Sequence, residues 1–241
     1  MRLETIQIPN DVTPLAGLRY VPSKTRKATA LLYAHGFTSS KHSFDGLASY
    51  LAGRGYEGVS FDFPGHKMGA TGGELQSMGE AVSSVHSALL WLVENTEAER
   101  VVLVGHSLGA AASLAVAANA RHSVLNLAGV VSLCMGAEPA RGFSSVVGRA
   151  MLAQRADYVV GKPALELLLE LEGVLPTAGA LDGFPSLFLA AKQDVLVSPE
   201  RVEALARVLG GEEISTLDAS HVDAPDKAKS AIIGWLEAQG W

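Results

Sequence analysis

Ser107 stands between two glycines in the motif Gly105-His106-Ser107-Leu108-Gly109. A serine in Gly-x-Ser-x-Gly sits on a tight turn when a strand precedes the motif and a helix follows it. The apolar run 101–104 and the alanine-rich stretch 108–120 meet both conditions. Glycines in such a turn remove side chains that would clash. The motif therefore predicts that Ser107 is a nucleophile whose hydroxyl points into a cleft.

Strand and helix patterns alternate around this motif. Two short strands with a Pro/Gly turn come first and suggest a hairpin. Continuous apolar runs, typical of strands buried on both faces, follow at residues 28–34, 58–63, 101–104, 127–135 and 186–191. Helical periodicity is seen near residues 44–51, 82–93, 108–116, 202–209 and 232–236. This alternation predicts an α/β fold with a mostly parallel central sheet and helices on both faces.

One connection is much longer than the few residues usual in such folds. Residues 138–182 contain two helical patterns, at 146–160 and 164–171. We interpret them as a small inserted helical cap, and residues 1–137 and 183–241 as the core. Apolar side chains there suggest that the cap binds part of a substrate. The candidate pocket residues are Met151 and Leu168 in the cap and Met68 in a loop of the core.

Three motifs resemble those of the α/β-hydrolase superfamily, and the likeness runs over nearly the whole chain. Residues 33–37 (YAHGF) resemble the His-Gly turn after the third strand, and residues 61–66 (FDFPGH) resemble the Asp-x-x-Gly-His segment after the fourth. Residues 105–109 resemble the nucleophile elbow. Esterases and lipases with a cap before the last two strands are the most similar group. The chain departs from them at Lys67-Met68-Gly69, where relatives commonly have Gly-x-Ser, in a loop that usually borders the cleft.

The resemblance implies a triad in the chain order Ser, acid, His. His221 lies between the strand pattern 213–217 and the last helix, the family's position for the catalytic base. His122 follows a helix end and is interpreted as a solvated residue. Asp194 follows the apolar run 185–191, at the carboxyl edge of the sheet, and is the preferred acid. Four other acids are noted: Glu138 as the alternative, Asp182 and Asp218 as weaker candidates, and Asp62 as a residue that orders its own loop.

Acyl transfer also needs two donors for the developing oxyanion. We expect these to be the backbone N–H groups of Leu108, next to the nucleophile, and of Phe37, after the His-Gly turn. His35 is expected to pack or hydrogen-bond beneath that turn. His106 is expected to point away into the core.

The composition and net charge of the chain limit the classes of binding partner that we expect. The chain has 241 residues, 48% of them hydrophobic and 18% charged, with a net charge of −6. No Lys/Arg cluster is visible, so nucleic acid and anionic membranes are poor partners.

Cys134 cannot form an internal disulfide and is interpreted as a buried strand residue. No signal peptide or apolar run of about 18 residues is seen, which predicts a soluble, cytoplasmic protein. No metal cluster or nucleotide loop is visible, so neither a metal nor a cofactor is expected.

These features predict a serine hydrolase that cleaves a small carboxylic ester, with an apolar acyl or alcohol group, through an acyl-enzyme intermediate. Thioesterase, amidase, acyltransferase and cofactor-free perhydrolase activities use the same triad and stay open. A non-enzymatic, ligand-binding member of the fold is the alternative of a different class. The natural substrate and the oligomeric state are not indicated.

Overall fold

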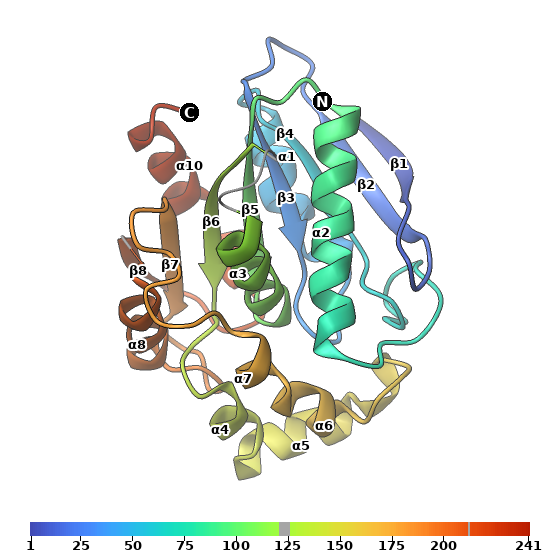
Figure 1. Cartoon of the computed structure of the whole chain (residues 1–241), viewed down its shortest axis with the longest axis vertical. Helices are drawn as coiled ribbons and strands as arrows, with labels where there is room; N and C mark the ends of the chain where they lie inside the picture. The colour runs from blue at the N-terminus through green and yellow to red at the C-terminus, as the bar shows by residue number, and fades with distance from the viewer. Residues whose placement is uncertain (121–125, 212) are drawn as a thin grey trace.

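The computed structural model describes residues 1–120, 126–211 and 213–241 (Figure 1). Within them, one eight-stranded sheet has the order β1-β2-β4-β3-β5-β6-β7-β8. The strands are β1 (Arg2–Ile8), β2 (Leu15–Val21), β3 (Thr29–Ala34), β4 (Glu57–Phe61), β5 (Arg100–His106), β6 (Leu127–Leu133), β7 (Ser186–Ala191) and β8 (Glu213–Leu217). β1 and β2 form the predicted hairpin, and β2 is antiparallel to β4. From β4 to β8 all neighbours are parallel, so the predicted sheet is confirmed.

Helices connect the parallel strands and cover both faces of the sheet (Figure 1). The helices of the described residues are α1 (Asp45–Ala52), α2 (Met78–Asn95), α3 (Leu108–Ala120), α4 (Pro139–Phe143), α5 (Val146–Gln154), α6 (Ala164–Leu169), α7 (Leu171–Val174), α8 (Pro199–Leu209), α9 (Ala224–Lys227) and α10 (Lys229–Ala238). Two 3₁₀ turns are η1 (Lys41–Phe44) and η2 (Ala156–Tyr158). None of these helices combines the length and hydropathy required to cross a bilayer.

Two hydrophobic cores lie on opposite faces of the sheet. Leu32 and Leu103 belong to the core formed with α2, α3 and α8. Their strand neighbours Leu31 and Val102 belong to the core formed with α1 and α10. Because successive side chains of a strand point to opposite faces, both faces need apolar residues. This two-sided burial explains why the strands are continuous apolar runs in the sequence.

Helices α4 to α7 lie together beyond the carboxyl ends of the strands, in the chain between β6 and β7 (Figure 1). We call residues 138–182 the inserted segment. Its middle is bonded to the loop that follows β4. The backbone N–H groups of Lys67 and Leu75 donate to the carbonyls of Tyr158 and Val160, both at 2.9 Å, and the Val160 N–H donates to the Gly65 carbonyl at 2.9 Å. These bonds fix the middle of the inserted segment to the core.

Two local predictions were wrong. The single helix expected over residues 146–160 ends at Gln154, and Val159 pairs instead with His66 as an isolated bridge. Val159 is β-branched and favours this extended conformation. The strand expected over residues 127–135 ends at Leu133; Cys134 is buried, but its φ of 54° takes the chain out of the sheet.

Candidate active site

Ser107 occupies a sharp turn between β5 and α3, with a left-handed φ of 51° that few non-glycine residues adopt. The glycines on either side are required sterically. A Cβ atom on Gly105 would lie 2.4 Å from the Gly109 carbonyl oxygen, and one on Gly109 would lie 2.1 Å from the Ala34 carbonyl oxygen. The Ser107 N–H donates to the Leu133 carbonyl at 2.9 Å, which ties the turn to β6. Backbone strain of this kind is typical of functional turns.

The two predicted oxyanion donors are the backbone N–H groups of Leu108, at the start of α3, and of Phe37, in the turn that follows β3. Leu108 is the first residue of α3, where a helix leaves its N–H groups without intrahelical acceptors. Among the described residues, neither its N–H nor that of Phe37 has a backbone acceptor. His35 lies beneath the turn, as expected. Its Nδ1 donates to the Gly36 carbonyl at 2.8 Å, and its Nε2 accepts from the Phe63 N–H at 3.1 Å.

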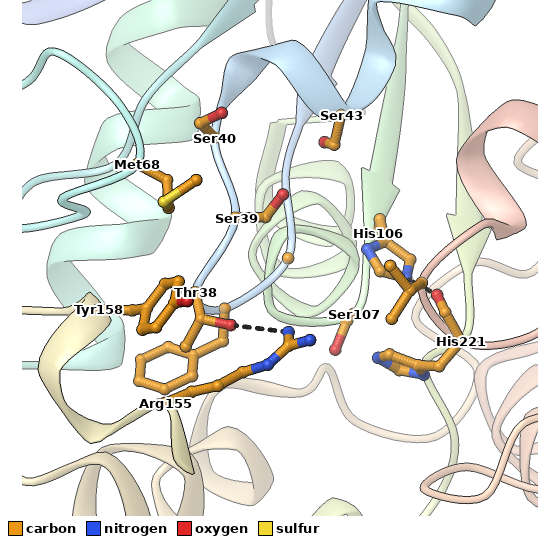
Figure 2. Close-up of a pocket in the computed structure, with 13 residues that line it drawn as sticks. Thr38, Ser39, Ser40, Ser43, Met68, His106, Ser107, Arg155, Tyr158 and His221 are labelled. Atoms are coloured by element: carbon orange, nitrogen blue, oxygen red, sulfur yellow. Dashed lines mark hydrogen bonds between the residues drawn. The ribbon is translucent and has the colours of Figure 1, made fainter. Parts of the chain in front are cut away.

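Asp194 and His221 are joined by a hydrogen bond of 2.6 Å from the imidazole Nδ1 to the carboxylate Oδ2. The other carboxylate oxygen accepts the N–H groups of Leu196 at 2.8 Å and Val197 at 2.9 Å. Burial raises the pKa of Asp194, but the hydrogen bond and charge of His221 and the two amide donors outweigh it, so the pKa falls below 3.8. The ionised carboxylate holds the Nδ1 proton and leaves the Nε2 lone pair free. Figure 2 shows the Ser107 hydroxyl beside this ring, in a shared cavity.

The other candidate acids do not contact His221. Glu138 is exposed and forms an ion pair of 3.3 Å with Arg141. Asp218 accepts a hydrogen bond from Gln193, and Asp182 is an exposed turn residue. Asp62 orders its own loop, as expected. It accepts the N–H groups of Lys41 at 2.7 Å and Ala70 at 2.8 Å and pairs with the Lys41 ammonium. His122 lies outside the described residues.

The expectation that His106 points away into the core was wrong. Its Nε2 donates to the His221 carbonyl at 2.8 Å, and the two rings lie 4.9 Å apart. Burial, and then the charge of His221, lower the pKa of His106 from 6.5 to about 3, so the ring is neutral. The opposite nitrogen faces Gly36, where a Cβ atom would lie only 2.7 Å from it. His106 therefore fills the space between the predicted oxyanion turn and the His221 loop.

Among the described residues, one group of side chains could hold a metal ion. His106, Cys134 and His221 each offer one ligand atom within 4.8 Å of the others. Two of these residues are engaged otherwise, because Asp194 binds His221 and the His221 carbonyl binds His106. Burial also raises the pKa of the Cys134 thiol, which disfavours the thiolate that metals prefer. The group fits hydrogen bonding better than metal binding.

Two cavities meet at Ser107. The polar pocket has a volume of about 290 Å³ and is lined by Gly36, Phe37, Thr38, Ser39, Ser40, Ser43, Met68, His106, Ser107, Arg155, Tyr158, His221 and Val222. The apolar pocket, about 60 Å³, is lined by Phe37, Thr38, Ser107, Phe143, Gly148, Met151, Leu152, Arg155, Leu196, His221 and Val222. Both are concave and adjoin the candidate nucleophile, as substrate sites do.

The predicted pocket residues divide between these cavities and the core. Met68 lines the polar pocket and Met151 the apolar pocket. Leu168 lines neither, because its side chain is 1% exposed and packs in the core beneath the inserted segment. The prediction for Leu168 was therefore wrong. Sequence reasoning also missed Arg155 and the hydroxyl groups of the polar pocket. The run Thr38-Ser39-Ser40 after the His-Gly turn was a usable signal for the hydroxyls, but no local pattern marks Arg155.

Comparisons with known proteins agree with this architecture. A family model described as alpha/beta hydrolase fold matches residues 29–146. An esterase of Pyrococcus furiosus is similar over 100% of this chain and 91% of its own, at 20% identity and a TM-score of 0.74. The esterase domain of a Rhodothermus marinus protein covers 99% of both chains at 22% identity and a TM-score of 0.70. Mouse alpha/beta hydrolase domain-containing protein 10 covers 100% of both at 15% identity and a TM-score of 0.72. A comparison with curated proteins finds no match.

The buried histidines predict that stability falls on mild acidification. Burial lowers the pKa of His35 and His106 from 6.5 to about 3, and that of His66 to about 4. The unfolded chain takes up these protons below about pH 6.5, but the folded chain does not until about pH 4. Their contribution is thus full above pH 6.5 and is lost as the pH falls, by about 1.4 kcal/mol per pH unit for each histidine. We expect the urea midpoint to drop between pH 7.5 and 5.5.

A His66→Gln variant removes one of these proton sites and should show a smaller drop. His86→Gln in α2 is the matched control, because His86 is exposed. Equal midpoints for the unsubstituted protein at the two pH values would contradict the prediction.

Proposed function

We propose, on the premise that the chain has the α/β-hydrolase fold, that it is a serine hydrolase that cleaves a carboxylic ester through an acyl-enzyme intermediate. One observation carries the proposal. The serine on the strained turn shares a cavity with His221, and His221 is hydrogen-bonded to the buried carboxylate of Asp194. An imidazole held in this way is the base that a serine hydroxyl needs to become a nucleophile.

Each group then has a defined task. The Ser107 oxygen attacks the ester carbonyl carbon while His221 Nε2 takes the hydroxyl proton. The N–H groups of Leu108 and Phe37 donate to the oxyanion that forms on the carbonyl oxygen. His221 returns the proton to the leaving alcohol, which gives the acyl-enzyme and the free alcohol. A water molecule, deprotonated by His221, then releases the acid and restores Ser107.

Electrostatics favour this cycle at neutral pH. The lowered pKa of Asp194 keeps its carboxylate charged, so it stabilises the imidazolium that forms when His221 accepts a proton. The neutral ring of His106, which donates to the backbone of His221, adds no competing charge. The His221 imidazole is therefore hydrogen-bonded to one carboxylate, that of Asp194. The His221 backbone carbonyl accepts a hydrogen bond from the neutral His106 ring.

The apolar pocket supports an apolar acyl or alcohol group. Phe143, Met151 and Leu152 reach it from α4 and α5 of the inserted segment, and Leu196 and Val222 from the core. We propose that the inserted segment acts as a cap whose side chains select the substrate, while the chemistry stays with the core. The polar pocket, at about 290 Å³, is near the lower end of the range of small-molecule sites, and the apolar pocket, at about 60 Å³, has room for only a small apolar group.

Replacement of the nucleophile tests the proposal directly. We expect Ser107→Ala to lower the hydrolysis of p-nitrophenyl esters by about a thousandfold or more, because the proposed acyl-enzyme forms on the Ser107 hydroxyl. The unsubstituted protein should react with a fluorophosphonate probe, and the variant should not. A folded Ser107→Ala variant with near-normal turnover would refute the assignment. Absence of labelling and of turnover in the unsubstituted protein would favour a non-enzymatic, ligand-binding role.

The acid is tested by a matched pair of isosteric substitutions. Asp194→Asn removes the charge that stabilises the imidazolium and should cost on the order of a hundredfold or more in kcat/KM. Glu138→Gln changes an exposed carboxylate that contacts Arg141, and should leave kcat/KM near its original value. Thermal melting of both variants checks that they fold. A larger loss for Glu138→Gln would move the acid to the loop after β6.

The role of the inserted segment is tested through chain-length preference. Met151→Ala enlarges the apolar pocket and should shift relative kcat/KM from short toward longer acyl esters in a p-nitrophenyl series. Val147→Ala on the same helix is the control, because Val147 is 53% exposed and lines neither cavity. Identical preferences in both folded variants would show that this pocket does not select the acyl chain.

A further inference from the structure

Arg155 brings a positive charge into the wall of both cavities, beside Ser107 (Figure 2). It follows the last residue of α5, and its Nη1 donates to the Thr38 hydroxyl at 3.3 Å. Ion pairs of the described residues engage many of the chain's arginines, but no acidic side chain pairs with Arg155. A guanidinium has five N–H donors, so most of its hydrogen-bonding capacity is available to a ligand.

The other wall of the polar pocket is rich in hydroxyl groups. Thr38, Ser39, Ser40 and Ser43 come from the segment that runs from the predicted oxyanion turn into η1. The Ser43 Oγ atom is buried and has no hydrogen-bond partner among the described residues. A buried hydroxyl without a partner costs free energy. These hydroxyl groups and the Arg155 guanidinium give the polar pocket more hydrogen-bonding side chains than the apolar pocket that adjoins it.

We propose that the polar pocket binds a carboxylate of the substrate, several bonds away from the ester, and that Arg155 is the residue that recognises it. This inference rests on the proposed ester hydrolysis. A carboxylate matches the fork of a guanidinium and can accept hydroxyl groups at the same time. The substrate is then an ester with an apolar group on one side of the carbonyl and an anionic group on the other.

Arg155 lines the two pockets, whereas the two preceding arginines of the inserted segment do not. Arg149 of α5 donates to the Ser144 carbonyl, and Arg141 of α4 pairs with Glu138. Neither lines a cavity. Arg149 is therefore a suitable control for a change of charge in the inserted segment that does not alter the polar pocket.

The test compares matched esters with and without a carboxylate. Monomethyl adipate and methyl hexanoate differ on the acyl side, and 4-carboxyphenyl butanoate and phenyl butanoate differ on the alcohol side. For each pair, kcat/KM is measured at pH 7.5 for the unsubstituted protein and for Arg155→Gln, Arg155→Lys and Arg149→Gln. The readout is the ratio of kcat/KM for the carboxylate ester to that for its neutral partner, so a general loss of activity cancels.

We expect Arg155→Gln to lower this ratio about tenfold or more for one of the two pairs, and the pair affected identifies the side that carries the carboxylate. Arg155→Lys should restore part of the ratio, and Arg149→Gln should keep it. High salt should weaken the preference, because the site is open to solvent. A ratio that Arg155→Gln leaves unchanged for both pairs would overturn the inference alone, provided that the neutral esters are cleaved. No turnover of any ester and no fluorophosphonate labelling would overturn the proposed function and this inference together.

Discussion

The close approach of α3 to the end of β3 is the constraint on which the rest of the site depends. Gly109 lets the first turn of the helix contact the Ala34 carbonyl, where any side chain would clash at 2.1 Å. This contact sets the turn at Ser107, and it brings the Leu108 amide toward the turn that carries the Phe37 amide. The buried strands supply the rigidity, because their parallel pairing and two-sided packing leave little freedom at their carboxyl ends.

The sequence was informative where function is tied to the end of a regular element. Ser107 and Asp194 each follow a strand that an apolar run predicts, and His221 follows the short strand pattern at 213–217, so their meeting at one edge of the sheet could be anticipated. Side chains of the inserted segment could not be placed in this way. Leu168 and Met151 are both apolar and lie on short helices, but which side faces a cavity depends on how those helices pack. Arg155 lies one residue after the observed end of α5, inside the range over which the sequence predicts a continuous helix.

Histidine is used in three different ways around the site. His35 holds the turn that carries the Phe37 amide, with both ring nitrogens bonded to the backbone. His106 supports the backbone of His221 as a neutral donor. Of these three, His221 is the one whose ring bonds a carboxylate and keeps one nitrogen free. Burial keeps the rings of His35 and His106 neutral and in structural roles, whereas the His221 ring is suited to proton transfer.

The hydrogen bonds between the inserted segment and the loop after β4 limit how the segment can be transplanted between related proteins. Gly65 belongs to the core, yet a Cβ atom there would lie 2.3 Å from the Val160 carbonyl oxygen, and Lys67 donates to Tyr158. The departure from the common Gly-His-Gly-x-Ser pattern falls in this loop. The segment and the loop therefore form one unit that is divided in the sequence. A chimaera that receives residues 138–182 without residues 64–75 would lack the acceptors and donors that hold the transplanted chain, and Arg155 would lose its orientation toward Ser107.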